Sequence, residues 1–332
     1  MAAYTTIDNP ELYFQVKLYT GNGGTNAITF DGDEDMSPDL VWLKMRSHAD
    51  NHTIFNTTSG VTKRLFSNLT QQESTESTSL TAFGTDGFTL GSDALANGNT
   101  KTFVAWAWKE SADAGFDILK YEGNATNRTI SHSLSAVPHW IIIKNLESTS
   151  SSAEHWLVYH KGTGNTHGVL LNEMTAKIDD ATYFQDTDPT SSVFSIGTAD
   201  RCNKNNEDNI AFLWSEKQGF SKFGKFTGNG STNGAFVYLG FRPAWVVVRR
   251  VNDSTHWQAQ DNKRGGFNPD NERLYLNDAA AEQTANFIDL LSNGFKCITS
   301  DAGGNGDGDT YIFMAFAESP FVNSKGVPNN AR

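Results

Sequence analysis

A short apolar string that occurs three times constrains the fold of this chain more than any other feature. Each copy has a proline, one variable position, four large apolar residues and then a cation. This pattern predicts a strand that is buried on both faces, entered through a turn and left at a solvated end. Because the copies recur at intervals of about a hundred residues, they indicate one structural unit that is used three times. The copies are PDLVWLK at residues 38–44, PHWIIIK at 138–144 and PAWVVVR at 243–249.

Further strands are predicted at matching places around each copy. An alternating segment that ends in a Gly-Asn turn precedes it, and that glycine lies 17, 15 and 15 residues before the repeated proline. A closing segment has large apolar residues on one face, such as Val104, Trp106 and Trp108, and smaller ones on the other. We expect the large face to pack in the core and the small face to be covered too. The opening segments are residues 14–23, 116–124 and 223–230, and the closing segments are 103–110, 209–216 and 311–318.

The chain is predicted to be all-β, with three tandem β-sandwich repeats of jelly-roll or lectin-like type, each about 100 residues long. Gly-rich turns, 22 phenylalanines and many β-branched residues fit this class. Only the three alanines after Asn277 suggest a short helix, over residues 278–283. The joints between repeats are short, so we expect fixed packing between them. The predicted parts are a lead-in over residues 1–12, repeats over 13–111, 112–217 and 218–321, and a tail over 322–332.

Composition and charge exclude several classes of partner. The net charge is −12 with a pI near 5.1, so the basic footprint of a nucleic-acid binder is missing and an anionic membrane surface is disfavoured. The two cysteines, Cys202 and Cys297, make neither a disulfide framework nor a zinc motif. The N-terminus lacks signal-peptide character, and no apolar run reaches the ~18 residues of a membrane-spanning helix. We expect a protein that is made in a reducing cytoplasm and does not insert into a membrane.

Five motifs along the chain carry a family resemblance: YTTID at residues 4–8, GFSKFG at 219–224, GFRPAW at 240–245, LSNGFK at 291–296 and YIFMAFAESPF at 311–321. They resemble motifs of a repeat family found in marine tailed bacteriophages, cyanophages among them. Members of that family are similar to tail-fibre-like and other virion proteins, and they carry no catalytic motif that transfers to this chain. The resemblance implies a location in the virion, other virion proteins as partners, and a structural or host-binding role. By analogy with fibres it also implies a homo-oligomer, specifically a trimer.

Two His-Trp pairs are candidate sugar-binding residues. His155-Trp156 and His256-Trp257 follow the second and third copies of the apolar string, on polar loops. A tryptophan face can stack on a sugar ring while a neighbouring histidine hydrogen-bonds its hydroxyls, as in many β-sandwich lectins. The competing interpretation is a repeated structural aromatic, and recurrence at matching positions favours it. Loop residues that do not recur are where we expect recognition to differ.

Two acidic loops are candidate calcium sites. Oxygen ligands at alternate positions, with glycines that permit a tight turn, are typical of calcium-binding loops. Neither loop has the glutamate that an EF-hand places at its last ligand position, so a solvated hairpin turn is the favoured interpretation. The candidate ligands are Asp31, Asp33 and Asp35 in the first repeat and Asn305, Asp307 and Asp309 in the third.

A carboxylate recurs at the end of each closing segment, as Glu110, Glu216 and Glu318. A glycoside hydrolase needs two carboxyl groups within roughly 5 to 10 Å of each other. The position of these glutamates after an apolar run favours a solvated or ion-paired strand end instead, with the cations of the repeated string as candidate partners. The chain has no nucleophile elbow, phosphate loop or HExxH helix, so neither enzyme activity nor an organic cofactor is expected.

The sequence thus predicts a non-enzymatic virion protein, a tail-fibre-like component for host recognition that binds a host surface glycan or lipopolysaccharide. The alternative is a capsid or tail decoration or assembly protein without receptor binding. In favour of the alternative, the first repeat begins within about a dozen residues of Met1, which leaves no separate anchoring domain of the kind a fibre uses. A glycan-degrading module is the least favoured. Any binding surface is expected on loops at one end of the sandwiches.

Overall fold

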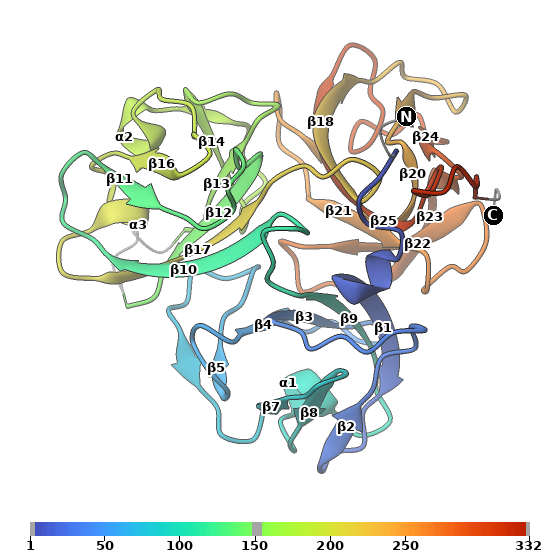
Figure 1. The fold of residues 1–332 in the computed structure, drawn as a ribbon, viewed down its shortest axis with the longest axis horizontal. Coiled ribbons are helices and arrows are strands. Elements are labelled where there is room, and N and C mark those ends of the chain that lie inside the picture. The colour runs from blue at the N-terminus through green and yellow to red at the C-terminus, as the bar shows by residue number, and fades with distance from the viewer. Residues whose placement is uncertain (1–3, 148–154, 330–332) are drawn as a thin grey trace.

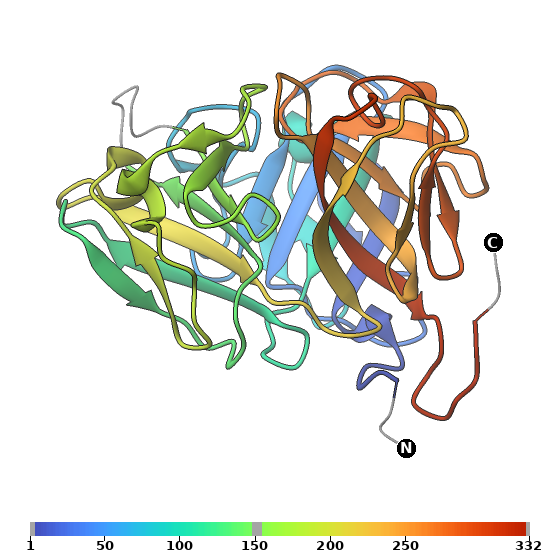
Figure 2. The same ribbon diagram turned by 90° about the horizontal axis from the view of Figure 1, so that it is seen from above.

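A computed structural model describes residues 4–147 and 155–329 of the chain. Within these residues the fold is all-β, as predicted: strands are joined by turns, one 3-10 turn and three helices of only four residues each. The strands form three units that surround a common centre (Figure 1). Seen from above, the second and third units lie on either side of the first (Figure 2). The described ends of the chain meet, because the Ser324 backbone N–H donates to the Asp8 carboxylate at 2.7 Å.

The helices and strands fall into three consecutive sets along the chain, one for each unit. Unit 1 contains η1 (Pro10–Leu12), β1 (Phe14–Thr20), β2 (Asn26–Ile28), β3 (Leu40–Met45), β4 (Thr53–Asn56), β5 (Lys63–Arg64), β6 (Ser74–Thr75), β7 (Leu80–Phe83), β8 (Phe88–Leu90), α1 (Ala94–Asn97) and β9 (Thr102–Trp108). Unit 2 contains β10 (Phe116–Glu122), β11 (Arg128–Ser131), β12 (Trp140–Asn145), β13 (Leu157–His160), β14 (His167–Leu170), β15 (Ile178–Asp179), α2 (Ala181–Phe184), β16 (Val193–Ile196), α3 (Asp200–Asn203) and β17 (Asp208–Trp214). Unit 3 contains β18 (Ser221–Thr227), β19 (Phe236–Tyr238), β20 (Phe241–Arg250), β21 (Gln258–Asp261), β22 (Asp270–Tyr275), β23 (Gln283–Leu291), β24 (Gly294–Cys297) and β25 (Thr310–Pro320).

The same four-strand order appears in all three units. It is β1-β9-β3-β4 in unit 1, β10-β17-β12-β13 within the sheet of unit 2, and β18-β25-β20-β21 within that of unit 3. Each repeated string forms the central strand of its unit and pairs antiparallel with the closing strand. Smaller sheets, β2-β8-β7 and β11-β16, complete units 1 and 2, whereas the sheet of unit 3 continues through β22, β23, β24 and β19. The three copies are therefore equivalent in topology around the central strand and differ outside it.

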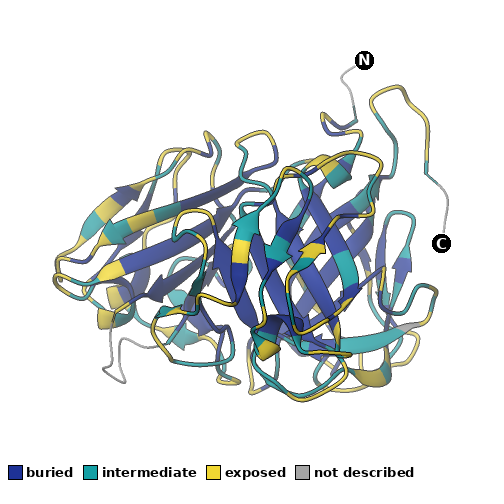
Figure 3. Ribbon diagram, turned by 90° about the horizontal axis from the view of Figure 1, so that it is seen from below, coloured by how far each residue is buried: buried dark blue, intermediate teal, exposed yellow. Residues whose placement is uncertain are grey.

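All eight tryptophans lie in one hydrophobic core that the three units share, and none is more than 2 % exposed. The large face of each closing strand points into this core, while small residues such as Ala105 and Ala107 pack in the separate core of unit 1. The buried strands stand out at the middle of the molecule (Figure 3). Both faces are covered as predicted, and the large face is the one that joins the units. Four indole pairs cross between units: Trp108 and Trp214 at 6.0 Å between ring centres, Trp140 and Trp245 at 6.3 Å, Trp108 and Trp245 at 5.5 Å, and Trp106 and Trp245 at 6.0 Å.

A side-chain N–H of each unit donates to a backbone carbonyl of a neighbouring unit, and the three bonds run in the same cyclic direction. We call this set the latch. In unit 1 a histidine takes the place of the tryptophan: burial lowers the pKa of His52 well below its ordinary value, and its other ring nitrogen accepts from Trp42. The latch bonds are His52 Nε2 to Tyr275 O at 2.8 Å, Trp156 Nε1 to Phe66 O at 3.0 Å, and Trp257 Nε1 to Leu170 O at 3.1 Å.

The cations that end the repeated strings are buried, so the prediction of a solvated strand end is wrong. Lys44, Lys144 and Arg249 are all 0 % exposed. Each donates to a carbonyl of the same neighbouring unit that the latch residue reaches, which satisfies an N–H group that burial would otherwise leave unpaired. Desolvation lowers the pKa of Lys44 to about 8 and that of Arg249 to about 9. The bonds are Lys44 Nζ to Ala279 O at 3.2 Å, Lys144 Nζ to Thr70 O at 2.9 Å, and Arg249 Nη2 to Thr175 O at 2.5 Å.

Backbone hydrogen bonds complete the ring of units. They also explain why the helix predicted over residues 278–283 does not form. The Ala279 carbonyl accepts from Lys44 and from the backbone of Asp50, so these residues lie against unit 1 instead of closing a helical turn. Residue 283 already begins β23. The equivalent backbone bonds at the three contacts are Glu73 N to Leu146 O, Lys177 N to Val251 O and Glu282 N to Arg46 O, at 3.0, 2.9 and 3.0 Å.

Paired Trp→Phe substitutions should isolate the contribution of the latch. Trp257 and Trp245 are both 0 % exposed, but the Trp257 indole donates to Leu170 O whereas the Trp245 Nε1 has no hydrogen-bond partner among the described residues. Trp257→Phe leaves a buried carbonyl without that donor, so it should lower the free energy of unfolding by about 1–3 kcal/mol more than Trp245→Phe does. Urea unfolding of the two variants measures the difference, and equal losses would contradict the latch.

Candidate functional site

The structure places the predicted sugar-binding tryptophans inside the protein. Trp156 and Trp257 are 1 % and 0 % exposed and form the latch, so neither ring face is open to a sugar from solvent. Their histidine neighbours are partly exposed: His155 contacts Asn172 at 2.9 Å, and the His256 ring stacks on Tyr275 with centres 4.2 Å apart. The repeated structural aromatic is therefore the correct interpretation of the tryptophans, and the predicted platform of a paired His and Trp does not form.

The predicted calcium ligands are not brought together. In residues 4–147 and 155–329, no group of three or more His, Cys, Asp or Glu side chains is placed to hold a metal ion. In the first loop, Asp31 pairs with Lys17, and Asp33 and Asp35 are exposed. In the third-repeat loop, Asp307 is exposed and Asp309 forms an ion pair with Arg250 at 2.8 Å.

Asn305, the remaining predicted ligand, is a structural clamp. It is 0 % exposed, and its amide nitrogen donates to Asn229 Oδ1, Ser231 O and Thr299 O at 2.7 to 2.9 Å. The equivalent asparagines, Asn97 and Asn203, hold the opening turns of units 1 and 2 in the same way. An amide that is engaged in this way is a repeat feature, so the calcium interpretation of Asn305 is wrong.

The recurrent glutamates mark three equivalent places, which we call the junctions. At each one, the end of a closing strand meets the variable position of the repeated string and the opening strand of the next unit around the ring. The first junction joins units 1 and 2, the second joins units 2 and 3, and the third joins units 3 and 1. In corresponding order, the variable positions are Asp39, His139 and Ala244; the residues after the neighbouring strand are Thr57, Lys161 and Asn262; and the glutamates are Glu110, Glu216 and Glu318.

The first junction is closed by hydrogen bonds among acidic residues. Asp39 accepts from the Glu110 backbone at 2.7 Å and from the Thr57 hydroxyl at 3.1 Å. Burial, then a hydrogen bond to the Asp117 carboxylate, raises the pKa of Glu110 to about 7. Asp117 is itself 4 % exposed and accepts from the Ser133 backbone at 2.6 Å.

The second junction is closed by an ion pair and a histidine. His139 Nδ1 accepts from the Glu216 backbone at 2.9 Å, and Lys161 pairs with the Glu216 carboxylate at 2.5 Å. The side chain at the variable position therefore plays the same part in two junctions: it fills the space beside the closing strand and accepts from the backbone of the glutamate.

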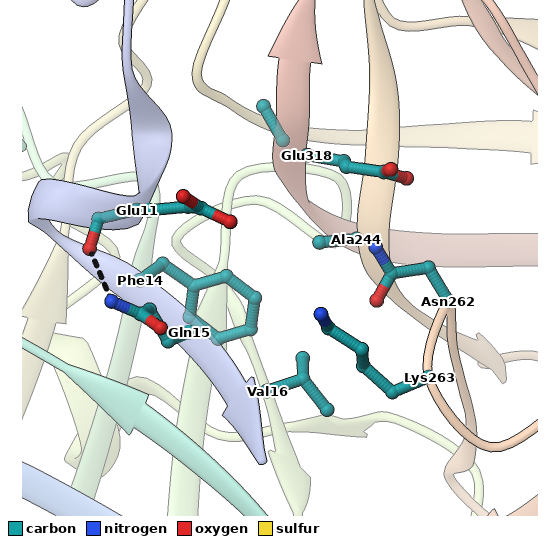
Figure 4. A pocket seen from close by; sticks show the side chains of 9 residues that line it. Glu11, Phe14, Gln15, Val16, Ala244, Asn262, Lys263 and Glu318 are labelled. Carbon is teal, nitrogen blue, oxygen red and sulfur yellow. Dashed lines mark hydrogen bonds between the residues drawn. The ribbon is translucent and has the colours of Figure 1, made fainter. Parts of the chain in front are cut away.

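The third junction contains a pocket of about 80 Å³ (Figure 4). Its variable position is Ala244, whose methyl group can neither fill the space nor accept a hydrogen bond. Phe14, Val16 and Ala317 form an apolar floor together with Ala244. The polar residues that line it are Glu11, Gln15, Asn262, Lys263 and Glu318. Figure 4 shows the Asn262 amide and the Lys263 ammonium directed into the space.

Neighbouring contacts fix the rim of this pocket. The Glu11 carboxylate accepts from the Asp33 backbone at 3.0 Å, and Glu318 is ion-paired with Arg242 at 3.1 Å. Asn262 is held by its backbone N–H, which donates to Ala244 O at 2.9 Å. Acceptors and one ammonium thus surround an apolar floor, an arrangement suited to binding a small polar molecule.

Sequence reasoning singled out Glu318 but not Glu11, Asn262 or Lys263. The available signal was the variable position of the repeated string, where alanine stands in one copy and a hydrogen-bonding side chain in the other two. The expectation that non-recurring residues mark recognition points to the same place.

Glu110→Gln should change how the free energy of unfolding depends on pH, and the equivalent substitution at the second junction should not. The folded pKa of Glu110 is raised above its unfolded value, so its contribution to stability is complete below pH ~4.5 and is lost as pH rises through about 7. The variant should match the wild type at pH 4 and exceed its free energy of unfolding at pH 8 by about 1 kcal/mol, after allowance for solvent screening. Denaturant unfolding at both pH values tests this. Glu216→Gln, which removes an ion pair, is the control and should show no such gain; a pH-independent difference at Glu110 would refute the assignment.

Comparison with known proteins gives one family match. A search of curated proteins finds no match to this chain. No helix in the described ranges is long and apolar enough to cross a membrane. A family model described as "Domain of unknown function (DUF7483)" matches residues 9–320, which span all three units and all three junctions. The chain therefore belongs to the DUF7483 family.

Proposed function

We propose that this chain is a non-enzymatic virion protein, a tail-fibre-like component that takes part in host recognition. The observation that carries the proposal is the contrast among the junctions: two are closed by their own side chains, and the third presents a pocket with polar groups at its rim. The resemblance of the repeat motifs to virion proteins of marine tailed bacteriophages supports the location.

The rest of the molecule supports a scaffold role. A buried histidine and two buried cations are hydrogen-bonded between units: His52 to Tyr275, Lys44 to Ala279 and Arg249 to Thr175. Side chains in such bonds fix the units relative to one another. A rigid framework that presents one adaptable surface is typical of recognition proteins.

Attachment to other virion proteins without receptor binding is the second candidate function. Phe236 and Tyr238 are 49 % and 47 % exposed on β19, the last strand in the order of the unit 3 sheet, and Phe267 is 81 % exposed. Exposed aromatic residues on an edge strand are characteristic of protein–protein contacts. This surface is compatible with host recognition as well, since a recognition component must also be held in the particle.

Labelling and adsorption assays on the phage that encodes the chain test the proposal. Antibodies against the purified chain should label its virions, and the purified chain should compete with those virions for adsorption to host cells. Labelling without competition would favour the attachment function. Absence of the chain from purified virions would overturn both, and release of reducing sugar from host glycans would overturn the non-enzymatic assignment.

A further inference from the structure

The pocket at the third junction exists because one side chain is missing from an otherwise repeated arrangement. Asp39 and His139 occupy the equivalent position in the other junctions and accept from the glutamate backbone at 2.7 and 2.9 Å. Ala244 has no side-chain acceptor, and a cavity of about 80 Å³ opens beside it. A cavity that has polar walls and is open to solvent holds water, which a ligand of matching polarity can displace.

Asn262 supplies an independent indication of a ligand. The residue is only 5 % exposed, and its Oδ1 is buried without a hydrogen-bond partner among the described residues. Figure 4 shows this amide directed into the pocket. A buried acceptor left without a donor lowers stability by about 1–3 kcal/mol, and a ligand hydroxyl group in the pocket would supply the missing donor.

The charges at the rim indicate a neutral ligand. Glu11 and Glu318 present carboxylates, which oppose an anionic group, and the Lys263 ammonium points into the same space, which opposes a cationic one (Figure 4). Hydroxyl groups satisfy both kinds of partner, because each one donates to a carboxylate or amide oxygen and accepts from an ammonium.

The floor and the size of the pocket narrow the ligand further. Phe14, Val16, Ala244 and Ala317 provide an apolar base that suits the C–H face of a sugar ring, while the polar groups stand at its edge. The volume of about 80 Å³ accommodates the edge of one ring, with the remainder in solvent. A terminal sugar of a longer glycan satisfies these conditions.

We infer that the third junction binds a terminal, uncharged sugar residue of a glycan, with Asn262 Oδ1 accepting from a sugar hydroxyl and Glu11, Lys263 and Glu318 contacting the others. This inference rests on the proposed function, because it assigns to host recognition its ligand class and its place on the fold. The first and second junctions, which are filled by their own side chains, bind no sugar.

Two pocket variants and one matched control test the inference on the full-length protein. Asn262→Ala removes the unpartnered acceptor, and Ala244→Asn fills the cavity with a side chain like that of the first junction. Thr57→Ala, at the position equivalent to Asn262 in the closed first junction, is the control. The probe is an immobilised array of neutral hexose- and deoxyhexose-terminated glycans, together with uronic-acid-terminated and free-amine-terminated glycans.

Wild type and Thr57→Ala should bind the same subset of neutral glycans. Asn262→Ala should weaken that binding by roughly tenfold, the factor expected for one lost hydrogen bond, and Ala244→Asn should abolish it. Thermal melting should show that Asn262→Ala is as stable as the wild type or more so, because the lost group has no partner inside the protein. If Asn262 had a purely structural role, Asn262→Ala would lower the melting temperature and leave glycan binding unchanged.

Three outcomes would overturn the inference: no binding to the array, binding only to charged glycans, or binding that both pocket variants retain. These outcomes are separable from failure of the proposed function. If the chain competes for host adsorption and the pocket variants compete equally well, the proposed host recognition is supported and the sugar site at the third junction is refuted. If the chain binds neutral glycans through the pocket but is absent from virions, the site stands and the virion role falls.

Discussion

The structure depends on the buried side-chain hydrogen bonds of the latch and of the repeated cations, which pass from each unit to the same neighbour in one cyclic direction. A buried N–H from His52, Trp156 or Trp257 reaches a carbonyl of the neighbouring unit, and a buried cation reaches the same neighbour a few residues further on. These donors lie in or beside the core that contains the eight tryptophans, where a donor without an acceptor lowers the stability. A wrong alignment of the units would leave several donors without acceptors. The apolar core supplies the bulk of the association, and the polar bonds fix its geometry.

The central and closing strands could be predicted because their determinants are local. A proline, a run of apolar residues and a period of two are visible in the sequence, and both faces of these strands are indeed buried. The latch could not be predicted in the same way, because its acceptors are backbone carbonyls of another unit and carry no side-chain signal. The prediction for Lys44 is wrong for this reason. Its position after an apolar run suggests a solvated strand end, but the neighbouring unit covers that end and buries the side chain.

The candidate site lies at a position where one copy of the repeat differs from the other two. Recurrence in the sequence favours a structural role for Trp156 and Trp257, and the informative residues are those at which the copies disagree. Ala244 differs from Asp39 and His139 by the loss of a hydrogen-bonding side chain, and that loss opens the pocket beside Asn262. The lining of the pocket comes from three segments far apart in the sequence, residues 11–16, 244–263 and 317–318, so no local pattern reveals it.

Placing all three units on one chain changes how the ring responds to its surroundings. A ring of separate subunits dissociates when it is diluted, because each contact must be re-formed by collision. Here only a few residues separate β9 from β10 and β17 from β18, so each contact is closed at a high effective concentration that dilution does not alter. One continuous chain also allows a single position to change without its two counterparts, which identical subunits cannot do. The same covalent link thus preserves the threefold frame and permits the asymmetry of its junctions.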